Sequence, residues 1–123
     1  TKMIEVGLST RSTFIFGALY WILVNSLLEE YVWRWFVFYQ SEKITGSKAA
    51  ILISSIGFTL HHIVAMQLYF NWIVVSLCAI GIFVGGIIWA WCYTMYRSVW
   101  PCYLSHAIVD VAIFGIAYQI LFG

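Results

Sequence analysis

Four long apolar stretches, separated by short polar segments, make up most of the chain. They run from Thr13 to about Tyr39, from about Ala49 to Tyr69, from Trp72 to Tyr96, and from Val99 to the end of the sequence. About 20 helical residues rise ~30 Å, which is the thickness of the hydrocarbon core of a bilayer. Each stretch is therefore predicted to form a transmembrane helix.

The polar segments mark the predicted helix boundaries. Residues 40–48 are predicted to be a loop because they are polar and contain Gly46. Ser98 is expected to cap the last helix, with Pro101 in its first turn, where a missing N–H group costs little. We thus predict an all-α, polytopic integral membrane bundle of about four helices in antiparallel serpentine order. Residues 1–123 would form one domain, which could be a piece of a longer protein.

Composition supports this assignment and restricts the partners. The chain is 63% hydrophobic and only 9% charged, whereas a soluble domain carries about 25% charged residues. Its formal net charge of +1 provides no basic surface for nucleic acid. The three cysteines have spacings that fit neither a zinc knuckle nor a thioredoxin motif, so they are interpreted as packing residues. A lipid bilayer is the expected environment, and nucleic acid is not an expected partner.

Ionisable residues inside the apolar stretches are few and concentrated. Seven of the eleven charged residues lie in flanks or loops, whereas four charged residues and all three histidines lie within predicted spans: Glu29, Glu30, Arg34, Asp110, His61, His62 and His106. Charged groups are costly in hydrocarbon, so an intramembrane ionisable residue is by default a hypothesis for a functional site. These side chains are the types that acid–base or metal chemistry uses.

Helical spacing separates the two adjacent glutamates of the first span. Residues four apart lie on one helix face, so Glu30 is expected to pair with Arg34 and to be neutralised by it. Glu29 is rotated by ~100° from Glu30 and is predicted to face the bundle centre as the reactive carboxylate. His61 and His62 are separated by the same rotation, so only one of them is expected to reach the site.

The positions of the polar residues along their spans are similar. Glu29 lies ~16 Å before the polar loop, and His62 lies ~20 Å after the start of its span on that side. His106 lies ~12 Å beyond the polar residues that precede the last span. If the helices run antiparallel, these residues are therefore predicted to meet at one depth.

Three motifs also carry a resemblance to a known family. In chain order they are Glu29-Glu30-x-x-x-Arg34, Phe58-x-x-x-His62 and His106-x-x-x-Asp110. Together they resemble the signature of the CPBP family (CAAX proteases and bacteriocin-processing enzymes, also called Abi), which includes the type II CAAX prenyl endopeptidases. Residues 97–106, which lead into the third motif, are also similar to that family.

The resemblance implies an all-helical intramembrane endopeptidase that hydrolyses a membrane-associated protein or peptide, in CAAX-type or bacteriocin-related processing. Glu29 and His62 would activate a water, His106 and Asp110 would lie near the developing oxyanion, and Glu30 with Arg34 would support the site. The partner would be a peptide or lipidated protein delivered through the membrane. The enzyme would be multi-pass, in the cell membrane of a prokaryote or the endoplasmic reticulum membrane of a eukaryote.

The sequence departs from the family signature at Asp110, and it allows either a metal-dependent or a metal-free reaction. The family often has asparagine at the position of Asp110; asparagine can donate to an oxyanion, whereas an ionised aspartate only accepts. Asp110 could instead orient His106 and favour its protonated form, or could belong to a metal's coordination shell. Two ways of activating the water stay open. One uses a divalent cation such as zinc, held by Glu29, His62 and His106, and the other uses no metal.

Two other functions also fit parts of the pattern. A non-catalytic immunity or scaffold protein could keep the fold without the activity. A proton-relay or transport protein is the other alternative, because chains of Asp, Glu and His mark proton paths in membranes. Short loops and the absence of an inverted repeat in the sequence argue mildly against a transporter. The identity of the substrate, its prenylation and the role of His61 are left undecided by the sequence.

Overall fold

The computed structural model describes residues 10–123, and all regular structure within them is helical. The chain divides into two compact units. Among the described residues, unit 1 combines residues 10–28 with Tyr103–Gly123, and unit 2 is Glu29–Cys102.

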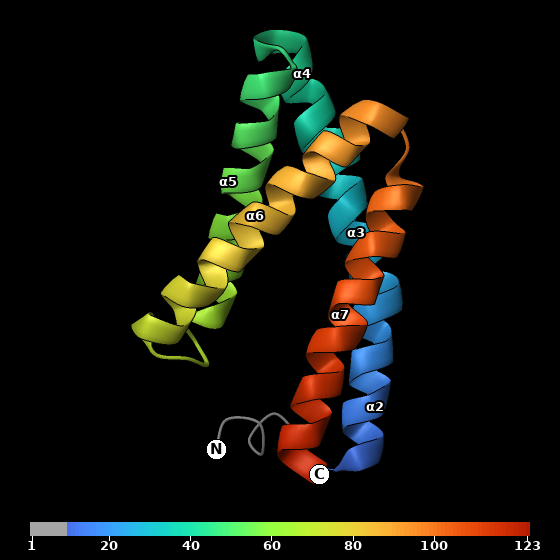
Figure 1. Ribbon diagram of the computed structural model, residues 1–123, viewed down its shortest axis with the longest axis vertical. Helices are drawn as coiled ribbons and strands as arrows, with labels where there is room; N and C mark the ends of the chain where they lie inside the picture. The colour runs from blue at the N-terminus through green and yellow to red at the C-terminus, as the bar shows by residue number, and fades with distance from the viewer. Residues whose placement is uncertain (1–9) are drawn as a thin grey trace. The chain divides into compact units, whose positions relative to one another are not determined.

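Unit 1 is built on a pair of helices from the two ends of the chain. It contains α2 (Arg11–Tyr20), η1 (Trp21–Asn25), the start of α3 (Ser26–Glu30) and most of α7 (Val99–Phe122). Figure 1 shows α2 and α7 side by side. Phe14 of α2 is only 4% exposed, because its ring packs at 5.6–6.1 Å from three rings of α7, those of Phe114, Tyr118 and Phe122.

The first long helical stretch contains two π-helical segments. It runs without interruption from Arg11 to Thr45, and η1 and η2 (Tyr31–Phe38) flank the short α3. In a π-helix the N–H group bonds to the carbonyl five residues back rather than four, as Ser26 does to the carbonyl of Trp21. Such turns are frequent at functional sites. Here they directly precede and follow the helix that carries Glu29 and Glu30.

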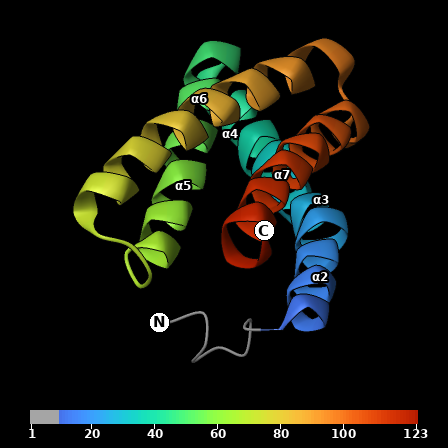
Figure 2. The same ribbon diagram turned by 60° about the horizontal axis from the view of Figure 1, so that its bottom comes forward.

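Unit 2 packs η2, α4 (Tyr39–Thr45), α5 (Ser47–Met66) and α6 (Trp72–Tyr96) around an apolar core. Figure 2 shows α5 and α6 adjacent to each other. Gly86 lets them approach closely, because a Cβ atom there would lie 3.3 Å from the Phe58 ring and 3.4 Å from the backbone of Ser55. The buried apolar residues of this core are Phe38, Ala50, Phe58, Trp89, Ala90, Tyr93 and Cys102.

The predicted loop at residues 40–48 is wrong. Helix α4 continues through Thr45, and only Gly46 separates it from α5. Gly46 has a φ of 85°, which glycine adopts without steric cost, so one residue reverses the chain. Ser47 donates a 2.6 Å hydrogen bond to Glu42 across this turn. The polar composition of the segment therefore marks the exposed end of a helical hairpin rather than a loss of helix.

The other predicted boundaries agree more closely with the structure. Helix α6 starts at Trp72, and the side chain of Asn71 caps it by accepting a 3.1 Å hydrogen bond from Val74 N. Helix α7 starts at Val99, and the hydroxyl oxygen of Ser98 accepts from Trp100 N at 3.3 Å. Helix α5 ends at Met66, three residues before the predicted end of the second span.

The predicted all-α fold with four spans is confirmed. Four helical stretches among the described residues have the length and apolar composition to cross a membrane: Arg11–Thr45, Ser47–Met66, Trp72–Tyr96 and Val99–Phe122. Large apolar side chains on their surfaces are exposed, such as Phe16 (73%), Ile73 (75%) and Ile108 (69%). Soluble monomers rarely expose extended apolar surface, so these side chains are suited to contact with lipid. The chain is a multi-pass integral membrane protein.

Candidate active site

Glu30 and Arg34 form a fully buried ion pair in unit 2. Glu30 Oε2 lies 3.2 Å from Arg34 Nε, and both side chains are 0% exposed. This is the pair that their four-residue spacing predicts. Burying either charge alone would cost several kcal/mol, so each makes the burial of the other tolerable.

Arg34 also connects three helical elements of unit 2. Its Nη2 atom donates a 3.2 Å hydrogen bond to the carbonyl of Gly86 in α6. Its guanidinium carbon lies 4.6 Å from the centre of the Phe58 ring of α5 and 5.6 Å from that of Trp89. Cations are attracted to the faces of aromatic rings at such distances. Arg34 thereby fixes the position of η2 against α5 and α6.

Glu29 faces His62, and the geometry indicates that one particular ring nitrogen of the histidine, Nδ1, carries a hydrogen. His62 Nδ1 lies 2.8 Å from the carbonyl oxygen of Phe58, one helical turn earlier. A carbonyl only accepts hydrogen bonds, so Nδ1 carries a proton, and a neutral His62 has its lone pair on Nε2. That Nε2 atom lies 3.4 Å from Glu29 Oε2, and the Glu29 side chain is only 8% exposed. A nearly buried carboxylate is thus held close to the basic nitrogen of a partly exposed imidazole.

A second carboxylate–imidazole pair lies in unit 1. His106 Nε2 is 3.6 Å from Asp110 Oδ2, one turn further along α7, and both residues are buried. Ser26 of α3 donates a 2.6 Å hydrogen bond to the same Asp110 oxygen. Sequence reasoning missed Ser26, although a hydroxyl residue within an otherwise apolar run was a signal that could have identified it.

The structure thus brings the predicted site residues together as pairs. Glu30 contacts Arg34 and Glu29 contacts His62 in unit 2, whereas His106 contacts Asp110 in unit 1. That the two units contribute to one reaction centre at a common depth stays a prediction. His61 is exposed, and its ring lies 6.0 Å from the Trp33 ring and 5.3 Å from the His62 ring.

Glu29 and His62 are two of the three ligands that the zinc alternative requires. Catalytic zinc sites usually take three protein ligands. Glu29 and His62 supply two donors within unit 2, and the third candidate ligand, His106, belongs to unit 1. Across residues 10–123, no group of three or more His, Cys, Asp or Glu side chains is placed to hold a metal ion. The pair in unit 2 therefore does not form a complete zinc site by itself.

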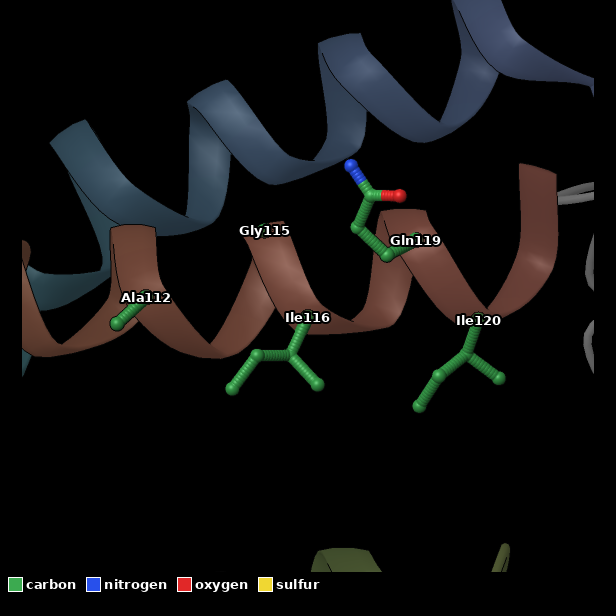
Figure 3. Close-up of a pocket in the computed structure, with 5 residues that line it drawn as sticks. All are labelled: Ala112, Gly115, Ile116, Gln119 and Ile120. Carbon is green, nitrogen blue, oxygen red and sulfur yellow. The ribbon is translucent and has the colours of Figure 1, made fainter. Parts of the chain in front are cut away.

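A pocket along α7 does not coincide with these groups. It is lined by Ala112, Gly115, Ile116, Gln119 and Ile120, all on α7. Figure 3 shows Ile116 and Ile120 pointing to the same side of the helix, whereas Gln119 reaches toward α2. None of these side chains can serve as a general acid or base at neutral pH, so the pocket is not a candidate for the reaction centre.

Four apolar helical spans and two carboxylate–imidazole pairs within them define a class of protein. This class is the multi-pass membrane proteins that carry acid–base residues inside their helices. Within this class, residues 11–112 match the family model described as type II CAAX prenyl endopeptidase Rce1-like. The match covers most of the chain, so the protein belongs to this peptidase family, which confirms the resemblance seen in the three motifs. No curated protein and no solved structure matches the chain.

Proposed function

We propose that this protein is an intramembrane endopeptidase that hydrolyses a peptide bond of a membrane-associated protein or peptide. The observation that carries the proposal is the 3.4 Å contact between Glu29 and His62, in which the hydrogen bond to Phe58 directs the basic nitrogen of His62 toward the carboxylate. Family membership supports a peptidase activity and a lipidated CAAX-type substrate. The membrane would be the cell membrane in a prokaryote and the endoplasmic reticulum membrane in a eukaryote.

In the proposed mechanism, Glu29 and His62 activate one water. A water at ~2.8 Å from both acceptors can donate one hydrogen to Glu29 and the other to His62. Its oxygen attacks the carbonyl carbon of the peptide bond while its proton moves to the Glu29 carboxylate. The C–N bond then breaks, and protonated Glu29 returns the proton to the leaving amine.

His106 and Asp110 are proposed to stabilise the negative charge that develops on the substrate. Attack by water leaves a negative charge on the former carbonyl oxygen, which positioned hydrogen-bond donors stabilise. A protonated His106 would be such a donor, and the Asp110 carboxylate, 3.6 Å from its Nε2 atom, would be the counter-charge beside it. This assignment gives Asp110 a role even though it cannot donate as asparagine would.

The proposed mechanism uses proton transfer and no metal. Glu29 and His62 together provide the two acceptors that one water needs, whereas a catalytic zinc would need a further protein ligand. If a cation were held by Glu29 and His62, it would lower the pKa of a bound water and so supply the same nucleophile.

A reconstituted cleavage assay tests the function. Purified protein in liposomes would be given a fluorogenic peptide that ends in a prenylated cysteine and three further residues, and the same peptide without the lipid. The wild type is expected to cleave, and Glu29→Gln and His62→Ala are each expected to lower kcat by a factor of about 10²–10⁴. His61→Ala is the matched control, because this exposed neighbour is not in the proposed machinery.

The two substrates separate general peptidase activity from lipid selectivity. Cleavage of the prenylated peptide alone would support a CAAX-type substrate, whereas equal cleavage of both would support a broader membrane peptidase. Normal rates in both Glu29→Gln and His62→Ala would overturn the proposal. Proton flux without any cleavage would favour the relay alternative instead.

A further inference from the structure

Ser26 makes a short hydrogen bond to Asp110, a residue of the third motif. The residue is 0% exposed, and its Oγ atom lies 2.6 Å from Asp110 Oδ2 and 3.2 Å from the Trp21 carbonyl oxygen. A hydroxyl has a single hydrogen to donate. The 2.6 Å distance lies in the range of charge-assisted O–H···O⁻ bonds, so the hydrogen is directed to the carboxylate.

The bond from Ser26 involves the same carboxylate oxygen that faces His106. Asp110 Oδ2 is the atom 3.6 Å from His106 Nε2, and Asp110 itself is 8% exposed. Rotation of the carboxylate would break the bond to Ser26 and leave a polar oxygen without that donor in a nearly dry site. Ser26 therefore restrains the orientation of Asp110 toward His106.

The backbone around Ser26 is built to hold this position. The N–H group of Ser26 closes the π-turn by bonding to the carbonyl of Trp21, five residues earlier. The hydroxyl of Tyr103 donates a 2.9 Å hydrogen bond to the carbonyl of Leu23, inside the same turn. The segment from residue 21 to 26 is thus joined to α7 at two points.

The α7 partners of this segment lie on one face of their helix. His106 and Asp110 follow Tyr103 by three and seven residues. At these spacings side chains lie above one another on one face of an α-helix. The π-turn therefore packs against the face of α7 that carries the third motif. Local packing alone would not require a buried hydroxyl directed to the one carboxylate of that face.

We propose that Ser26 is a positioning residue for the third motif, which holds the Asp110 carboxylate in the orientation that aligns His106 with the oxyanion. The inference rests on the proposed peptidase function, because it assigns Ser26 a role in the same reaction. Ser26 does not touch the reacting atoms. Its effect is transmitted through Asp110 to His106.

The test compares Ser26 variants in the liposome cleavage assay. Ser26→Ala is expected to lower kcat about 10- to 100-fold with KM changed less than about twofold, since the lost bond is to a charged group. Ser26→Thr keeps the hydroxyl and is expected to recover most of kcat. Ser54→Ala is the matched control, because Ser54 is also 0% exposed but donates only to a carbonyl of its own helix.

A double-mutant comparison separates positioning from a general structural effect. In an Asp110→Ala background, Ser26→Ala is expected to cause little further loss of kcat, because the bond is already absent. If Ser26→Ala lowers kcat by the same factor in the Asp110→Ala background as in the wild type, the inference is overturned. If Ser26→Ala does not fold, Ser26→Cys has a similar size and a weak donor; a loss of kcat supports the inference, and wild-type kcat in a folded Cys variant overturns it.

The outcomes distinguish this inference from the proposed function. Cleavage that is lost in Glu29→Gln but unchanged in Ser26→Ala overturns the role of Ser26 and keeps the peptidase. No cleavage by the wild type, or normal cleavage by both Glu29→Gln and His62→Ala, overturns the proposed function and the inference with it.

Discussion

At the scale of single residues, Arg34 shows how a charge is accommodated inside an apolar unit. Its guanidinium faces the Glu30 carboxylate, a backbone carbonyl and two aromatic rings, and no part of its side chain is exposed. The pair adds little net stability over an apolar pair of the same size, but the loss of one member leaves the other charge buried alone.

Replacement of Arg34 is therefore expected to be strongly destabilising. Arg34→Met should lower the free energy of unfolding by about 3–5 kcal/mol, because the fully buried Glu30 loses its counter-charge. Thermal unfolding in detergent micelles, followed by circular dichroism, would measure the loss. The double variant Glu30→Leu/Arg34→Met should recover much of it, since neither charge remains. A double variant less stable than Arg34→Met would contradict this explanation.

The exposed pair of Arg97 and Glu42 provides the matched control. Arg97 Nη2 lies 2.9 Å from Glu42 Oε2, but the Arg97 side chain is 48% exposed, so Arg97→Met should cost at most about 1 kcal/mol. The hydrogen bond to Glu42 raises the pKa of Arg97 above its usual value. A raised pKa gives stability that is present below the unfolded pKa and is lost only at more alkaline pH. The difference between the variant and the wild type should therefore stay constant across the neutral range.

The proposed metal-free activation of water also leads to a prediction about single residues. Glu29 and His62 supply two donors, whereas a catalytic zinc usually takes three protein ligands. Cleavage is therefore expected to survive treatment with a strong chelator, and purified protein is expected to carry substoichiometric zinc. Elemental analysis and the liposome assay would be run on the same preparation. Stoichiometric zinc, together with activity that chelation removes and added zinc restores, would show that a metal ligand set was missed.

At the scale of helical elements, the contact between α5 and α6 depends on one glycine. Gly86→Leu is expected to destabilise the protein by about 1–3 kcal/mol or more, because its Cβ atom would already touch Phe58 and the Ser55 backbone. Gly81→Leu on the same helix is the control, since a Cβ atom there meets nothing within 4 Å. Thermal unfolding would compare them. An equal loss of stability in both variants would show that helix propensity, not the contact, was measured.

The same elements show what the sequence could and could not predict. Helix number and the i, i+4 pairs, such as Glu30 with Arg34, follow from apolar length and from periodicity, which act locally. The π-turns were not predicted, because the distribution of apolar residues along the chain does not show whether a backbone N–H group bonds four or five residues back. Ser26 is visible in the sequence as a hydroxyl residue in an apolar run, but its role was missed because its partner, Asp110, lies 84 residues away on α7. The predicted loop at residues 40–48 was wrong because polarity indicates exposure to water rather than loss of helix.

At the scale of the whole molecule, the four spans predict on which side of the membrane each connection lies. Within unit 2, Glu42 and Arg97 are paired, so the α4–α5 turn and the end of α6 lie at one end of the unit. Helix α5 has 20 residues and rises ~30 Å, so its far end should emerge on the opposite side of the bilayer. Figure 1 shows the α5–α6 turn at the end of α5 away from α4.

Cysteine labelling in sealed vesicles tests this arrangement. Lys48→Cys and Arg97→Cys should react with a membrane-impermeant maleimide from the same side, and Gln67→Cys only from the other side or after permeabilisation. The native cysteines lie within α6 and α7, so wild-type labelling provides the blank. Substitution of Lys48, which is exposed, should leave cleavage unchanged and would show that the labelled protein is active. Labelling of all three positions from one side would mean that α5 does not cross the bilayer, and the common depth predicted for Glu29 and His62 would then lose its basis.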